Sequence, residues 1–265
     1  MWRLKGKRVL RVLLLADRWS VLDGRLLRRP STGRSGVCGP VIGIILLCWT
    51  SPVRADDRAM CSDSKPLNDS VAACSRLIEA DPENAKALAV RAWDYAQLDR
   101  GSDGLPDCLK ALNIAPNMYD AHIACGVVYE HIRQYAKSVA EYDRALEIAP
   151  DSPHYTGRLE NRGKTLMRWG KFDEALADLN KALELDSKSW FGYWVRGKVY
   201  MAQSKFDLAL ADFTELIHYK AYWVTGYCLR GQAYLALQRP DKADEDFKSA
   251  ERLAGSGGRC ALPLS

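Results

Sequence analysis

The sequence predicts an all-α fold, a solenoid built from antiparallel helix hairpins. Three observations favour it: similar short segments recur every 34 residues, apolar residues recur in three- and four-residue steps, and small residues return at fixed positions of the repeat. A fixed period of about 20 to 50 residues is typical of repeat architectures. The three- and four-residue steps are the period of amphipathic helices.

Residues 1–55 are predicted to be a basic extension followed by a secretory signal peptide. A basic stretch ending at Arg34 precedes the apolar run 41–49, and residues 51–55 supply a cleavage site after Ala55. The run is shorter than the roughly 20 residues that a membrane span needs. We therefore expect an exported protein, periplasmic or secreted, with no stable membrane span after cleavage. An uncleaved signal anchor is the alternative.

The charge is unevenly spread and argues against nucleic acid as a partner. Eleven of the 38 Lys and Arg residues and two of the 33 acidic residues lie in 1–55, which leaves 27 basic and 31 acidic residues downstream. The body is therefore mildly acidic and offers a polyanion no general attraction.

Residues 56–84 are predicted to be a cysteine-containing loop and an N-terminal half repeat. Six cysteines follow the proposed cleavage site, and an even number in an exported chain suggests disulfides. Cys61 and Cys74 are the favoured pair, because their bridge would tether a short loop to the first helix. For Cys108 and Cys125 two alternatives remain open: a disulfide between sequential helices, or two buried thiols that pack as small apolar residues.

Residues 85–257 divide into five units, and we number the first residue of each unit as position 1. The units are 85–118, 119–152, 156–189, 190–223 and 224–257, with three inserted residues near 151–155. Position 8 is always Ala or Gly, and position 20 is Ala in the last three units. Large residues return at position 11 in all five units and at position 24 in units two to five. Since Gly inside a helix costs about 1 kcal/mol relative to Ala, its repetition at position 8 indicates close helix packing.

Unit one departs most from this pattern, because Gly104 and Pro106 interrupt the start of its second helix. Pro is tolerated in the first turn of a helix. We therefore expect that helix to begin near Asp103 and to be short. Residues 258–265 are predicted to be a flexible tail.

The period and the small–large–small signature resemble the tetratricopeptide repeat (TPR) family over about 190 of the 265 residues. The N-terminal half unit is similar to the opening of many exported bacterial repeat proteins. The resemblance implies a right-handed α-solenoid of about five and a half units. It also implies a non-catalytic scaffold or adaptor for protein–protein interaction, without a cofactor.

One repeat position recurs as a basic residue and another as an acidic residue along the array. Position 7 holds Arg in four units and position 23 holds Asp or Glu in all five; the residues are Arg91, Arg162, Arg196 and Arg230, with Asp107, Glu141, Asp178, Asp212 and Asp246. A catalytic site needs distinct groups that converge once, whereas this pattern recurs in almost every unit. We therefore interpret it as structural pairing between helices.

The remaining polar residues predict no metal site and no catalytic site. The four histidines are scattered, and His122 and His131 share a helix at a spacing that suits no metal motif. Short motifs of metalloproteases, serine hydrolases and phosphate-binding loops are absent from the sequence.

In TPR proteins the first helix of each unit lines a concave groove, with repeat positions 2, 5, 9, 12 and 13. Carried over to this chain, the resemblance implies a groove formed by Trp93, Ile123, Val127, Glu130, Glu160, Lys164, Met167, Arg168, Phe191, Trp194, Lys198, Met201 and Gln232. Aromatic and Met side chains beside lysines suit a protein or peptide segment with apolar anchors and acidic groups.

The sequence thus favours an exported TPR adaptor that binds a protein segment. Two alternatives belong to other classes: a structural solenoid that self-associates through its end units into a homo-oligomer, and a small repeat enzyme or cofactor carrier. The enzyme class is disfavoured because no polar groups converge.

Overall fold

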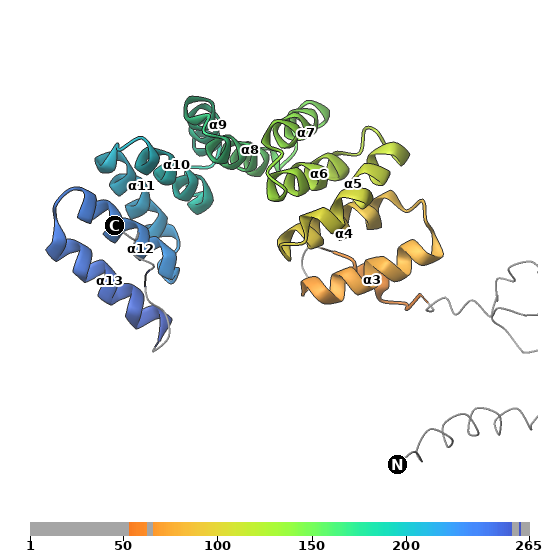
Figure 1. Cartoon of the computed structure of the whole chain (residues 1–265), viewed down its shortest axis with the longest axis horizontal. Helices are drawn as coiled ribbons and strands as arrows, with labels where there is room; N and C mark the ends of the chain where they lie inside the picture. Colours follow the sequence, from red (N-terminus) through yellow and green to blue (C-terminus); the bar gives the residue numbers. More distant parts are fainter. Residues whose placement is uncertain (1–52, 63–65, 256–259, 261–265) are drawn as a thin grey trace, which may run out of the picture. The chain divides into compact units, whose positions relative to one another are not determined.

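The structure is a computed structural model that describes residues 53–62, 66–255 and 260. Every secondary-structure element in this part of the chain is a helix (Figure 1). Each of the five units holds a hairpin; the pairs are α4 (Ala85–Gln97) with α5 (Gly101–Ile114), α6 (Tyr119–His131) with α7 (Tyr135–Ile148), α8 (Tyr155–Trp169) with α9 (Phe172–Leu185), α10 (Trp190–Ala202) with α11 (Phe206–Tyr219), and α12 (Val224–Ala236) with α13 (Pro240–Ala254). The predicted all-α solenoid of helix hairpins is confirmed.

Within the described residues, two helices precede the hairpins. The longer one, α3 (Leu67–Ala80), packs against α4 as the half repeat. The short α2 (Asp57–Met60) packs against α3, where the buried Asp57 carboxylate accepts hydrogen bonds from the Arg76 guanidinium. Cys61 and Cys74 form a disulfide that ties the end of α2 to the same helix. Residues 57–62 are thus held to α3 by one ion pair and one covalent bond.

The two helices of a hairpin approach closely because position 8 carries no large side chain. A Cβ added to Gly197 would lie 2.5 Å from the Phe213 ring, and one added to Gly231 would lie 2.5 Å from the Phe247 ring. These rings occupy position 24 of their units. In unit one the roles are reversed, since a Cβ on Gly104 at position 20 would lie 2.6 Å from the Ala92 carbonyl oxygen. Gly104 is therefore a packing residue rather than an interruption.

The expectation of a short second helix in unit one is wrong. Helix α5 begins at Gly101 and contains 14 residues, as many as α7, α9 and α11. It continues through Pro106, which lacks the N–H that would bond to the Ser102 carbonyl. Packing against α4 and α6 compensates for that single lost bond.

Each hairpin turn contains one residue with a positive φ at repeat position 15. These residues are Asp99, Arg133, Gly170, Ser204 and Gln238, with φ between 57° and 83°. Only unit three uses the residue type that adopts this conformation without cost. The other turns are held in place by the helices that they connect.

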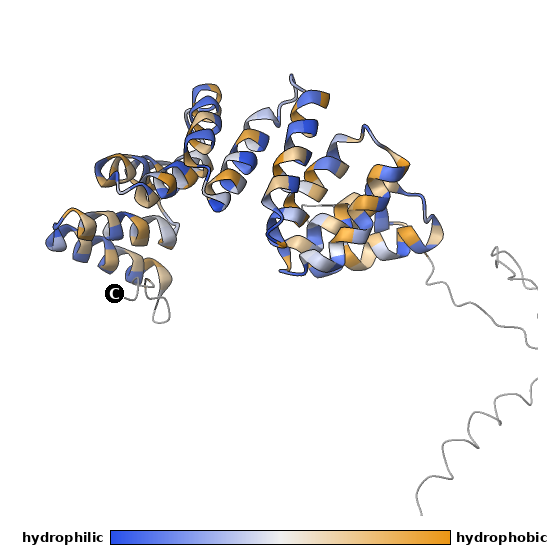
Figure 2. Ribbon diagram, turned by 45° about the horizontal axis from the view of Figure 1, so that its top comes forward, coloured by the Kyte–Doolittle hydropathy of each residue, from blue (hydrophilic) through white to orange (hydrophobic). Residues whose placement is uncertain are grey.

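The core is a series of apolar clusters along the array, not one central mass. Fully buried residues such as Tyr142 and Phe213 fill the space between the helices of their own hairpin. Figure 2 shows that hydrophobic and hydrophilic residues lie on different sides of the helices. The inserted residues lengthen the connection between α7 and α8, next to a small cluster of Leu146, Leu159 and Ala182.

Among the residues described, no helix is long and apolar enough to cross a membrane. Residues 1–52 of the predicted leader lie outside the described residues, as does the predicted tail 258–265 apart from Cys260.

Candidate functional site

The position-7 arginines pair with the position-23 aspartates of the same unit. In units one, three, four and five, Nε and Nη2 of the arginine donate to the two carboxylate oxygens at 2.6 to 2.9 Å. The aspartates are at most 9% exposed. Each pair joins the two helices of one hairpin, so the ladder stabilises the hairpins and engages these eight side chains in structural pairing.

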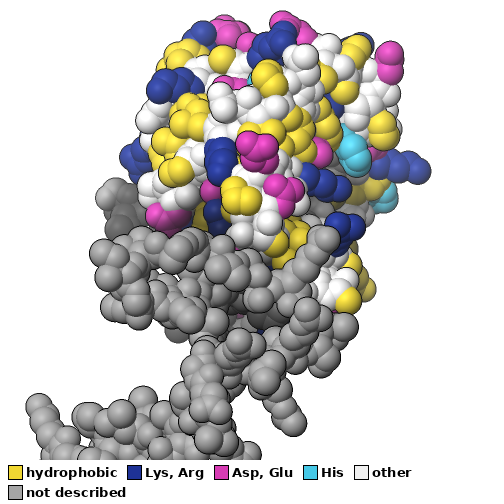
Figure 3. All heavy atoms as spheres, turned by 90° about the vertical axis from the view of Figure 1, so that its right-hand side faces the viewer, with side chains coloured by type: hydrophobic (Ala, Val, Ile, Leu, Met, Phe, Trp, Pro, Cys, Tyr) yellow, Lys and Arg dark blue, Asp and Glu magenta, His cyan; other side chains and the backbone are white. Residues whose placement is uncertain are grey.

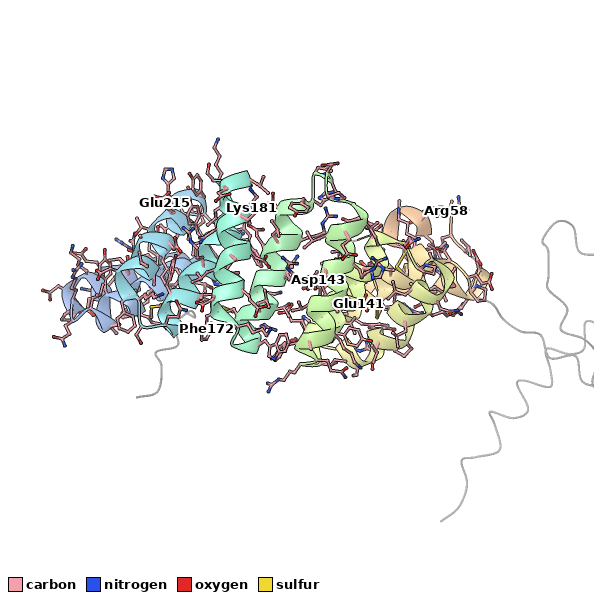
Figure 4. All side chains as sticks on the ribbon, turned by 90° about the horizontal axis from the view of Figure 1, so that it is seen from above. Arg58, Glu141, Asp143, Phe172, Lys181 and Glu215 are labelled. Atoms are coloured by element: carbon pink, nitrogen blue, oxygen red, sulfur yellow. A yellow bond between two sulfur atoms is a disulfide. The ribbon has the colours of Figure 1, made fainter. Side chains whose placement is uncertain are left out.

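Unit two lacks the position-7 arginine and uses two other links. Cys125 takes that position and forms a disulfide with Cys108 of unit one, with a Cα–Cα distance of 5.3 Å. The acid of the same unit, Glu141, accepts a hydrogen bond at 2.7 Å from Nδ1 of His122. Figure 4 shows Glu141 and Asp143 on α7, where Asp143 accepts a hydrogen bond from Arg162 of unit three.

A third disulfide joins Cys228 of α12 to Cys260, with a Cα–Cα distance of 5.3 Å. All six cysteines downstream of the proposed cleavage site are therefore paired. Within the described part of the chain, no group of three His, Cys, Asp or Glu side chains could hold a metal ion.

A cationic cluster lies on the first helices of units three and four. It consists of Lys164 and Arg168 on α8 and Lys198 on α10. The only acid that pairs with it in the described structure is Glu130 of α6, whose oxygens lie 3.1 Å from the Lys164 Nζ and from an Arg168 Nη1. Glu130 is 1% exposed, and neither oxygen has a partner in hydrogen-bond geometry. The Glu130 charge is balanced by the nearby cations without hydrogen bonds to them. With three cations and one acid, the cluster keeps a surplus of two positive charges.

Lys198 is the cation of this cluster without an acidic partner in the described structure. Burial, followed by repulsion from Arg168 and Lys164, lowers the pKa of Lys198 below its usual value. Its Nζ lies 5.1 Å from the centroid of the Trp194 ring, an attractive cation–π contact. The site therefore holds a half-buried ammonium group in a position that disfavours its charge.

Aromatic and Met side chains border the cluster. The Phe191 and Trp194 rings lie 5.2 Å apart, and Trp194 packs edge-on against Trp223 at 5.7 Å. Met167 and Met201 are half-buried at the edges of the adjoining apolar clusters. The Trp194 Nε1 is buried and has no hydrogen-bond partner within the described residues. The indole N–H is therefore an unsatisfied buried donor beside the cluster.

The structure places the other five groove residues in three different surroundings. Val127 and Glu160 are 4% and 6% exposed, and Glu160 accepts a hydrogen bond from the Ser189 hydroxyl. These two residues offer little surface to a partner. Trp93 and Ile123 lie on α4 and α6, away from the cationic cluster, where they line a cavity with α2. Gln232 is half-buried on α12.

Sequence reasoning did not foresee the aromatic residues at the unit junction. Trp190 and Trp223 pack at 5.3 Å, and Lys220 Nζ lies 3.4 Å from the Trp190 ring centroid. Their residue types were a usable signal, because aromatic side chains begin unit four and end it. On the face in Figure 3, by contrast, acidic, basic and apolar side chains are interspersed.

The sequence comparisons agree with this architecture. Residues 119–152, 158–189 and 224–256 match the family model described as tetratricopeptide repeat. No curated protein matches the sequence.

Three solved structures illustrate the similarity of fold. PilW, described as a type IV pilus biogenesis factor, superposes with a TM-score of 0.64 and 21% identity, covering 70% of this chain and 85% of its own. A tetratricopeptide repeat protein from Parabacteroides merdae superposes with a TM-score of 0.58 and 23% identity, covering 72% of this chain and 73% of its own. YrrB, described as a TPR protein with an unusual peptide-binding site, superposes with a TM-score of 0.50 and 19% identity, covering 71% of this chain and 95% of its own. At these identities the likeness shows the fold alone.

Proposed function

Because this chain is a tetratricopeptide repeat protein, built as a protein-interaction scaffold, we propose that it is an exported adaptor that binds an acidic protein segment on α8 and α10. The observation that carries the proposal is the surplus of positive charge around Lys198. Burial and the two neighbouring cations disfavour the charged form of the Lys198 ammonium group. Groups with perturbed pKa values cluster at functional sites, which supports this surface as the binding site.

The chemistry of the partner follows from the neighbouring side chains. A carboxylate placed at Lys198 would face three cations and one acid, and so would neutralise part of the surplus. Phe191, Trp194 and the two methionines provide an adaptable apolar surface beside it. A segment with acidic residues next to an aromatic or aliphatic residue satisfies both features.

YrrB, which is described as having a peptide-binding site, supports a peptide-binding role, because this fold carries a peptide-binding site in that protein. Export is supported by the basic leader and its apolar run, and by three disulfides in one small domain. Disulfides of this density persist in oxidising compartments and are rare in the cytosol.

The test compares three forms of the protein in affinity capture from the compartment where the chain resides. The wild type is set against Trp194→Ala plus Lys198→Glu, and against Lys181→Glu on the exposed side of α9 as a control with the same change of charge (Figure 4). We expect the double variant to lose proteins that both other forms retain. Synthetic peptides from a captured protein should then bind with an affinity that falls as salt is raised. Equal recovery by all three forms would exclude this surface.

A further inference from the structure

A cavity of about 370 Å³ lies between α2, α4 and α6, separate from the cationic cluster. Its floor is apolar, with Val90, Trp93 and Ile123 among the lining residues. Pockets of 300 Å³ or more, on the order of a small ligand's volume, with a mainly apolar lining and a few polar groups are typical ligand sites. This cavity has both the size and the lining of such a site.

One wall of the cavity is built by the segment that precedes the repeats. Arg58, Cys61 and Ser62 come from this segment (Figure 4 labels Arg58). The segment is fixed by the Cys61–Cys74 disulfide and by the ion pair between Asp57 and Arg76. The wall is therefore a pre-organised part of the site, and Arg58 is presented to the cavity on a constrained backbone.

The charges in the lining leave one positive charge unbalanced. Arg58 and Lys86 supply two cations and Asp120 one carboxylate, and none of the three has an ion-pair partner among the described residues. A single carboxylate on a ligand would balance these three lining charges. A planar guanidinium pairs with a carboxylate through two hydrogen bonds, so a carboxylate suits Arg58.

A buried arginine adds to the positive potential. Arg158 is 2% exposed, and its guanidinium carbon lies 4.9 Å from the centroid of the Tyr119 ring, which lines the cavity. Its Nη2 donates to the Ala149 carbonyl oxygen, while its Nε and Nη1 have no hydrogen-bond partner within the described residues. No acidic side chain of the described structure pairs with it. Its charge is weakly screened at this depth and lies next to Tyr119, a residue of the cavity lining.

We propose that this cavity is a second binding site, for an apolar group that carries one carboxylate. The apolar part would pack on Trp93 and Ile123, and the carboxylate would pair with Arg58 and Lys86. Two sources supply this chemistry: the last residue of a protein chain, when that residue is apolar, and a free apolar acid.

Calorimetric titration of the full oxidised chain tests the proposal with four probes. N-acetylphenylalanine stands for a chain end and 3-phenylpropionate for a free acid, and the amide of each is its neutral counterpart. We expect the acids to bind with Kd on the order of 0.1 to 1 mM, as for other ligands of this size, and the amides at least about ten-fold more weakly. The tighter of the two acids identifies the source. Amides that bind as well as the acids, or no measurable binding by any probe, would overturn the proposal.

A charge-matched pair of variants locates the binding. Arg58→Ala removes an exposed cation of the cavity, and Lys110→Ala removes an exposed cation on α5 outside it. Neither side chain has an ion pair in the described structure, so neither change should affect folding. Arg58→Ala should weaken both acids about ten-fold and leave the amides unchanged. If the acids bind equally well to both variants, the carboxylate does not lie at Arg58 and the proposed site is wrong.

Discussion

Arg162 donates from Nε and Nη2 to the two carboxylate oxygens of Asp178, at 2.7 and 2.6 Å. The pair crosses one hairpin from α8 to α9, and a third nitrogen of Arg162 reaches Asp143 of the preceding unit. The same arginine thus joins the helices of its own unit and links that unit to its neighbour.

Arg162→Met should lower the free energy of unfolding by about 2–4 kcal/mol, because it leaves the 7% exposed Asp178 carboxylate without its partner. Urea unfolding followed by circular dichroism measures the change. Adding Asp178→Leu should restore most of the loss, since an apolar pair needs no counter-charge. Arg144→Met breaks an exposed pair with Glu147 and should change stability by less than about 0.5 kcal/mol. Equal losses in Arg162→Met and Arg144→Met would contradict the structural role of the ladder.

Two glycines of the array should respond to alanine in opposite directions. Gly197→Ala should destabilise by about 1–3 kcal/mol, since the new Cβ meets the fully buried Phe213 ring, which has no space to move. Gly157→Ala should stabilise by up to about 1 kcal/mol, because a Cβ there meets nothing within 4 Å and alanine favours the helix. Thermal unfolding of both variants checks the pair. An increase in thermal stability in both variants would show that the helices do not pack as closely as described.

The Cys108–Cys125 disulfide should contribute about 2–4 kcal/mol to stability, because it closes a loop of 17 residues across two units. Cys108→Ala plus Cys125→Ala should therefore unfold at lower urea concentration than the wild type under oxidising conditions. In strong reductant the difference between the two proteins should shrink. A difference that is the same with and without reductant would assign the effect to packing of the two side chains, not to the bond.

Glu160 should make stability fall as pH rises. Burial raises the pKa of this carboxyl above its ordinary value, so the native state holds the proton more tightly than the unfolded chain. Its contribution to stability is complete below about pH 4 and is lost as pH rises through the raised pKa. Glu160→Gln removes that loss. The free energy of unfolding of Glu160→Gln, measured by urea titration, should therefore rise relative to that of the wild type between pH 4 and pH 7. A difference that does not change with pH would argue against a buried titrating carboxyl.

Lys198→Met should stabilise the protein and weaken its binding. The pKa of Lys198 is lowered, so the charged side chain costs stability at neutral pH, and the gain from Met should shrink as the solution is made alkaline enough to neutralise the wild-type lysine. The same change removes the cation proposed to meet an acidic partner, and capture of that partner should fall. Lys181→Met, on an exposed pair with Glu184, is the control and should change neither property. Loss of stability with unchanged capture would show that Lys198 is only a structural residue.

The sequence alone determined most of the fold, because that information is local and repeated. Gly at position 8 and a large residue at position 24 recur at one spacing in units two to five, so hairpin packing can be inferred from a pattern shared by four units. Pairing of position-7 arginines with position-23 acids was predictable for the same reason. Unit one shows the limit of this logic: Gly104 and Pro106 suggested a short helix, yet packing against α4 and α6 maintains all of α5.

Only the tertiary structure decided which side chains of the first helices are available. Glu160 and Glu130 occupy positions that line a groove in related proteins, but one is buried against Ser189 and the other balances Lys164 and Arg168. Glu130 contacts residues of the next unit, and Glu160 contacts the last residue of its own unit, 29 positions away. No periodicity specifies these contacts. The cavity beside Arg58 likewise depends on where a disulfide and a buried ion pair place a segment outside the repeat. Period and helix packing follow from local patterns, whereas the charge and shape of a site depend on distant residues brought together by folding.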